Sequence, residues 1–145
     1  MAVDAASVGE VLGGRKVLEK EIANTADLAE AVEAGLPRAS LEIVVERVTG
    51  DGREATDLKH RIVPKTTLQR RGARLSPEES ERLERLARLM ALAEQVWENR
   101  DLAREFMTSR QPQLDDERPV DLVRSELAAR RAEDLLWTLE YSLPV

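Results

Sequence analysis

The sequence contains no cysteine and only one histidine, His60. Disulfide bonds, thiolate metal sites and multi-histidine metal sites are therefore excluded. Aromatic residues make up only 3% of the chain, so leucine, valine and alanine must fill most of the core. Because alanine, leucine, arginine and glutamate favour helices and strand-favouring aromatic residues are scarce, the composition predicts an all-α fold.

Long apolar runs are also missing. No stretch approaches the roughly 20 apolar residues that a membrane helix needs. Asp4 and Glu10 interrupt the start of the chain, where a signal peptide would be apolar. We therefore expect a cytoplasmic protein with no membrane partner.

The sequence has little of what a catalytic or metal site requires. A single histidine removes most acid–base pairs, and no glycine-rich loop is followed by the lysine of a phosphate-binding loop. The acidic residues 115–117 lack the alternating ligands and the glycine turn of a calcium loop, so a solvated acidic loop is the simpler interpretation. We expect no enzyme activity, no cofactor and no metal site.

What the sequence does have is an uneven distribution of charge. The formal net charge is -6, yet residues 53–74 carry seven basic and two acidic residues, and the segments on either side are acidic. Local charge matters more than the total for contacts with phosphates. The residues alone fit two interpretations of this basic segment, a DNA-contacting surface or a solvated, salt-bridged helix face.

The first part of the chain divides into short helices. The Gly13–Gly14 pair would interrupt a helix, so we expect residues 1–24 to be poorly ordered or partly structured. The first clear helix is predicted to begin near Thr25 and to stop at Gly35. Another is predicted over 40–48, where apolar residues recur at helical spacing.

The basic segment has a helix-turn-helix pattern. A helix over 54–62 is followed by Pro64, and the residue before a proline avoids helical geometry, so the helix must end there. Residues 65–71 then form a short second helix, which Gly72 ends. Its side chains are of types that contact phosphates and base edges. The candidate DNA-binding residues are Lys65, Thr66, Thr67, Gln69, Arg70, Arg71 and Arg74.

The clearest boundary in the sequence is a capping-box pattern at Ser76, Pro77 and Glu79. It places serine at the N-cap, proline at the first helical position and glutamate where it can reach back to the cap. The helix that follows should run to about Trp97 with two adjacent apolar stripes. A helix with so wide an apolar surface should lie centrally and join the cores of the two halves.

Three shorter helices follow, and they are predicted over residues 101–108, 119–123 and 126–141. In the first, Leu102, Phe106 and Met107 should face the core. Ser125 can cap the last. The chain then ends in residues 141–145, an apolar, aromatic-bearing segment with no obvious core partner, which either frays or contacts a partner.

From residue 62 onward the sequence resembles the Xre/MbcA/ParS antitoxin family, whose members pair with RES-domain toxins. Residues 63–71 resemble the family's Ile-Pro-x-x-Thr-Leu-x-x-Arg, and residues 74–83 are close to its Arg-Leu-Ser-x-Glu-Glu-Ser-Asp-Arg-Leu. The family's later motifs occur in the same order, at residues 88–96, 118–123 and 131–141.

Four positions depart from the family pattern. Asp115 and Asp116 stand where the family often has two glycines. Ser142 stands where the final Glu-Tyr pair is usually followed by glycine, and Ile62 replaces the glycine of the helix-turn-helix.

The resemblance implies an Xre-like helix-turn-helix domain over 25–74 and a toxin-binding domain over 75–145. RES toxins of this kind degrade NAD, and the family's antitoxins bury their C-terminal helix and tail in the toxin's active-site cleft without binding NAD themselves. The resemblance also implies a homodimer, within a larger toxin–antitoxin complex, that binds operator DNA and represses its own operon. The alternative is a freestanding helix-turn-helix transcriptional regulator whose C-terminal half only dimerises. The implied toxin-binding residues are Arg130, Arg131, Asp134, Trp137, Tyr141, Ser142, Leu143, Pro144 and Val145.

Overall fold

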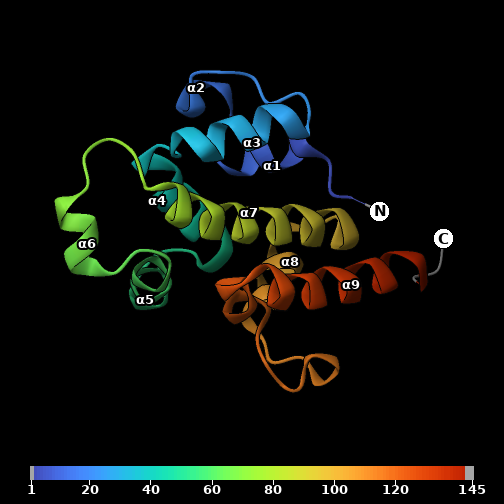
Figure 1. The fold of residues 1–145 in the computed structure, drawn as a ribbon. Coiled ribbons are helices and arrows are strands. Elements are labelled where there is room, and N and C mark those ends of the chain that lie inside the picture. Colours follow the sequence, from blue (N-terminus) through green and yellow to red (C-terminus); the bar gives the residue numbers. More distant parts are fainter. Residues whose placement is uncertain (1, 143–145) are drawn as a thin grey trace.

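The computed structural model describes residues 2–142, and the regular secondary structure of this part of the chain is entirely helical (Figure 1). The predicted all-α fold is confirmed. In chain order the helices are α1 (Ala5–Val11), α2 (Gly14–Leu18), α3 (Thr25–Ala34), α4 (Arg38–Thr49), α5 (Arg53–Ile62), α6 (Lys65–Arg70), α7 (Pro77–Trp97), α8 (Arg100–Thr108), the 3-10 helices η1 (Pro112–Leu114) and η2 (Pro119–Arg124), and α9 (Glu126–Ser142).

Helix α7 runs through the middle of the molecule (Figure 1). It contacts α1, α3, α4 and α5 from the first half of the chain and α8, η2 and α9 from the second. Its large apolar side chains, among them Leu83, Leu86 and Met90, are fully buried. The prediction of a central helix that joins the two cores is confirmed.

The start of α7 has the predicted capping box. The Ser76 hydroxyl accepts a hydrogen bond from the Glu79 backbone N–H at 3.1 Å, and the Glu79 carboxylate accepts one from the Ser76 N–H at 2.8 Å. Pro77 occupies the first helical position, where its missing N–H costs no hydrogen bond. Two of the otherwise unpaired backbone groups at the helix start are thereby satisfied.

Residues 5–18 form two short helices within the segment that we expected to be poorly ordered or partly structured. Gly13 separates α1 from α2 with a φ of 121°, and a Cβ there would lie 2.7 Å from the Cβ of Val17, so glycine alone fits. Helix α1 packs on α7, and α2 packs on α4. Val8 and Leu12 are buried, so this segment contributes to the core.

Backbone hydrogen bonds join the segment between α6 and α7 to the segment between α3 and α4. The N–H of Leu75 donates to the carbonyl of Leu36 at 2.9 Å, and the N–H of Arg38 donates to the carbonyl of Ala73 at 2.9 Å. Gly35 lies beside this contact, and a Cβ there would come within 2.4 Å of the Leu75 carbonyl oxygen. The pairing holds the segment that connects α6 to α7 against the first half of the chain.

The predicted inward orientation of Leu102 on α8 is wrong, because this side chain is 47% exposed. Ala103, Phe106 and Met107 are buried instead. These three positions have the spacing of one helix face, and Leu102 lies beside that face. The predicted burial of Phe106 and Met107 is confirmed.

The last helix matches its predicted range to within one residue, because α9 continues through Ser142. The Ser125 hydroxyl accepts a hydrogen bond from the N–H of Ala128 at 3.1 Å, as expected for an N-cap. Within residues 2–142, every helix is too short or too polar to cross a membrane.

The acidic loop before α9 explains one departure from the family pattern. Asp115 and Asp116 have φ values of 56° and 63°, in the left-handed region. Glycine adopts this region at the lowest cost, and aspartate is among the side chains that tolerate it. Aspartate is therefore compatible with the left-handed backbone at both positions.

Candidate functional site

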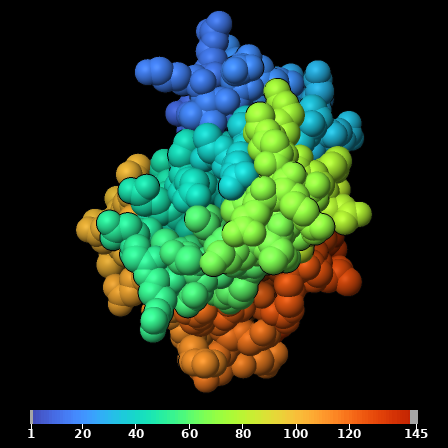
Figure 2. Space-filling model, turned by 90° about the vertical axis from the view of Figure 1, so that its left-hand side faces the viewer, coloured from blue at the N-terminus to red at the C-terminus, as the bar shows by residue number. Residues whose placement is uncertain are grey.

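The helix-turn-helix prediction corresponds to α5, the turn at Val63 and Pro64, and α6. Val63 has an extended backbone, with a φ of -133°, as expected before proline. Leu68 anchors α6 because it is buried, whereas the rest of this short helix faces mostly outward. Figure 2 looks onto the face of the molecule that carries α5 and α6.

The candidate DNA-binding residues divide into two groups. Lys65, Thr66, Gln69 and Arg70 are exposed on α6, and Thr67 is half-buried. These exposed side chains form a polar and basic surface of the kind that contacts a nucleic acid backbone.

The other two candidates, Arg71 and Arg74, donate hydrogen bonds within the protein, although Arg74 is also exposed. Arg71 donates two hydrogen bonds to the carboxylate of Glu79, at 2.9 and 3.0 Å. Arg74 donates to the carbonyl of Gly35 at 2.9 Å. Sequence analysis did not identify a third such contact, in which Arg38 donates to the carbonyls of Leu68 and Arg71 at 2.9 and 3.2 Å. These arginines hold α6 and its C-terminal end against the rest of the fold.

The candidate toxin-binding residues lie on α9. Arg130, Asp134, Tyr141 and Ser142 are exposed along one side of the helix. Leu127, which sequence analysis did not identify, extends the same side by one further turn and is 72% exposed. An apolar side chain in this position among polar neighbours is available to a partner.

Two further candidates on α9 are partly engaged within the chain. Arg131 lies 2.8 Å from the carboxylate of Asp115 and 3.4 Å from that of Glu117. These ion pairs attach the acidic loop to α9. The half-buried ring of Trp137 stacks on Tyr141 with the ring centroids 6.1 Å apart. Leu143, Pro144 and Val145 lie outside the described residues.

A partly buried charge cluster attaches α9 to α7. The guanidinium of Arg88 lies 2.8 Å from Glu126, 2.6 Å from Glu133 and 3.6 Å from Glu84. Three carboxylates thus share one cation. Burial, opposed by the charge of Arg88 and reinforced by those of Glu126 and Glu133, raises the pKa of Glu84 to about 7.

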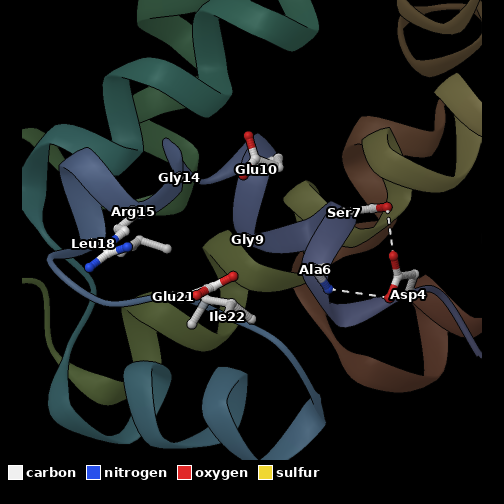
Figure 3. Close-up of a pocket in the computed structure, with 10 residues that line it drawn as sticks. All are labelled: Asp4, Ala6, Ser7, Gly9, Glu10, Gly14, Arg15, Leu18, Glu21 and Ile22. Atoms are coloured by element: carbon white, nitrogen blue, oxygen red, sulfur yellow. Dashed lines mark hydrogen bonds between the residues drawn. The ribbon is translucent and has the colours of Figure 1, made fainter.

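A pocket of about 310 Å³ lies on the N-terminal helices (Figure 3). Its lining mixes the carboxylates of Asp4, Glu10 and Glu21 with the guanidinium of Arg15 and apolar side chains. Asp4 is already engaged, because it accepts hydrogen bonds from the backbone and the hydroxyl at the start of α1. The described residues contain no cluster of three or more histidine or acidic side chains that could hold a metal ion.

Two family models match the chain. Residues 27–88 match the antitoxin Xre-like helix-turn-helix domain, and residues 92–141 match the antitoxin Xre/MbcA/ParS C-terminal toxin-binding domain. The boundary between the two matches falls inside α7, so one continuous helix contributes to both domains. Both domains are binding modules of non-enzymatic proteins, in agreement with the expectation that the chain is not an enzyme. No curated protein matches the chain.

Proposed function

Because the chain belongs to the Xre/MbcA/ParS antitoxin family, we propose that it is the antitoxin of a type II toxin–antitoxin pair and neutralises a RES-domain toxin. The observation that carries this proposal is the match of residues 92–141 to a toxin-binding domain. That match ends on α9, the helix that exposes Leu127, Arg130 and Asp134 along one side.

In this proposal α9 blocks the toxin's active site. An exposed aromatic ring at Tyr141 and an exposed aliphatic side chain at Leu127 bury well in a cleft shaped for nicotinamide and ribose. Arg130 and Asp134 lie between them and supply charges that select the partner's orientation. NAD is then excluded from the toxin without being bound by the antitoxin.

Co-expression with a RES-domain toxin, which the proposal expects to be encoded beside this chain, tests the proposal. The two proteins should purify together, and cellular NAD should stay at the level of cells without toxin. Asp134→Arg reverses an exposed charge on α9 and should release the toxin, so that NAD falls. Asp101→Arg, the same change at an exposed position on α8, is the matched control and should leave NAD protected.

We further propose that the chain binds its own operator as a homodimer through α6 and represses its operon. The match of residues 27–88 to an Xre-like helix-turn-helix domain and the exposed basic side chains of Lys65 and Arg70 support this. Lys65→Ala and Arg70→Ala should each weaken operator binding in a gel-shift titration. Each should also lower the slope of log affinity against log salt by about 0.9 per lost phosphate contact. Lys16→Ala, an exposed lysine on α2, is the control and should change neither.

The alternative is a freestanding helix-turn-helix regulator whose C-terminal half only dimerises. It predicts operator binding and a dimer in solution, with no RES-domain gene beside this one and no toxin in the purified complex. Operator binding without toxin binding would therefore favour the regulator and reject the antitoxin.

A further inference from the structure

A groove lined by arginines lies where the two halves of the chain meet. It has a volume of about 290 Å³ and is formed by α5, α7 and η2. Arg61 from α5, Arg82 from α7 and Arg124 from η2 line it. In pairs, these three arginines are 21, 42 and 63 residues apart along the chain, and only the tertiary fold brings them to one place.

The groove keeps a positive charge after its internal ion pairs are counted. Asp121 is the only acidic residue that lines it, and its carboxylate already accepts from Arg61 and Arg118. Arg124 is 55% exposed although it contacts Glu117 at 3.1 Å. Arg82 has no ion pair within the described part of the chain, so its charge is available to a ligand.

Beneath the arginines the groove is apolar, because Leu58, Ile62 and Val123 line it as well. A charged rim over an apolar floor suits a nucleotide backbone, in which charged phosphates alternate with less polar sugars.

The groove continues the basic surface of α6. Arg61 is near the end of α5, directly before the turn at Val63 and Pro64 that leads to α6. In Figure 2, residues of α5 and α6 and residues near position 120 share one face of the molecule. A duplex contacted by Lys65 and Arg70 can therefore pass over the groove as well.

We propose that this groove binds a backbone phosphate of the DNA that α6 contacts, with Arg82 and Arg124 as ligands and the adjoining sugar on the apolar floor. The inference rests on the proposed DNA-binding function and extends it, because Arg124 belongs to the part of the chain matched as a toxin-binding domain. The two domains then bind DNA as one unit rather than through the helix-turn-helix alone.

Gel-shift titrations with operator DNA and with an unrelated duplex, each over a range of salt concentrations, test the proposal. Arg82→Gln should weaken binding to both duplexes by the same factor, because a phosphate contact carries no sequence information. Because the two arginines share one phosphate, the salt slope should fall by about 0.9 in total when Arg82→Gln and Arg124→Gln are combined, and Arg82→Gln alone should account for part of that fall. Arg82→Lys keeps the charge and should restore most of the slope.

Arg15→Gln removes the same charge from an exposed position on α2 and is the matched control, with no change expected. Circular dichroism melting of each variant identifies a general loss of folding. If the wild-type protein binds no DNA, the proposed DNA-binding function and this inference both fail. If the wild-type protein binds and Arg82→Gln, while folded, keeps its affinity and slope, only the groove inference fails.

Discussion

Arg71 and Glu79 form a two-point ion pair that joins the end of α6 to the first turn of α7. Nε of Arg71 donates to Oε1 of Glu79 at 2.9 Å, and the second donor reaches Oε2 at 3.0 Å. The Glu79 carboxylate also completes the capping box with Ser76 and is only 3% exposed. Burial alone would raise the pKa of Glu79, but the hydrogen bonds from Arg71 and Ser76 outweigh it and lower that pKa. One carboxylate therefore fixes both the start of α7 and the position of α6.

This pair predicts that Arg71→Ala destabilises the protein, whereas Arg70→Ala does not. Loss of Arg71 leaves a buried carboxylate with fewer donors, which costs more than loss of an exposed charge. The urea midpoint of Arg71→Ala should fall clearly below that of the wild type, and that of Arg70→Ala should stay within error. Adding Glu79→Gln to Arg71→Ala should recover part of the loss. Equal midpoints for the two single variants would contradict a structural role for Arg71.

The Ser76 cap predicts a modest loss of stability in Ser76→Ala. The substitution removes the hydrogen bond from the Glu79 N–H at the start of the central helix. The expected cost is about 1 kcal/mol, the usual value for an N-cap serine. Chemical denaturation measures it, with Ser109→Ala as a control at a serine that caps no helix start. An unchanged midpoint in Ser76→Ala would show that the cap does not stabilise α7.

The charge cluster around Arg88 predicts a stability that declines as the pH rises. Glu84 has a pKa of about 7 in the folded protein against 4.5 for an ordinary glutamate. The folded state therefore holds more protons than the unfolded state between these two values, and raising the pH through this window favours unfolding. The effect of this one group is on the order of 2–3 kcal/mol between pH 4.5 and 8.

Glu84→Gln tests the pH dependence directly, because glutamine stays neutral throughout. The variant should be more stable than the wild type at pH 8, and its stability should change less between pH 5 and pH 8. Glu81→Gln, at an exposed position one turn earlier on α7, should keep the wild-type pH profile. Parallel pH profiles for the wild type and Glu84→Gln would exclude Glu84 as the titrating group.

We expect residues 141–145 to be needed for inhibiting the toxin but not for binding it. Residues 141–145 form an apolar, aromatic-bearing segment, and we expect them to enter the toxin's NAD cleft. Deleting them should leave a folded protein that still binds the toxin through the rest of α9. NAD loss should nevertheless return in cells that express both proteins. Protected NAD and normal growth would assign inhibition to the helix itself, around residues 130–139.

Short sequence patterns predicted the structure correctly where the stabilising contacts join residues that are close together in the sequence. The capping box at Ser76 joins residues three positions apart, and the break at Pro64 follows from the geometry of a single residue. Both features were therefore predicted from the sequence. Burial on α8 was predicted less well, because Leu102 and Ala103 are both apolar and only the position of the neighbouring helices decides which of them is buried.

By itself, the sequence determined the helical fold, most of the helix boundaries, the basic segment and the family, because each depends on residue types and short spacings. Only the tertiary structure decided the roles of individual charges. Arg71 and Arg70 are adjacent and alike in sequence, yet one is paired with a buried carboxylate and the other is exposed. Arg88 contacts Glu126 and Glu133, and Arg82 lines the same groove as Arg124, although about 40 residues of chain separate the members of each pair, a range over which spacing predicts no contact. The packing of η2 and α9 on α7 brings these charges together, and so decides which of them hold the fold and which remain available to a partner.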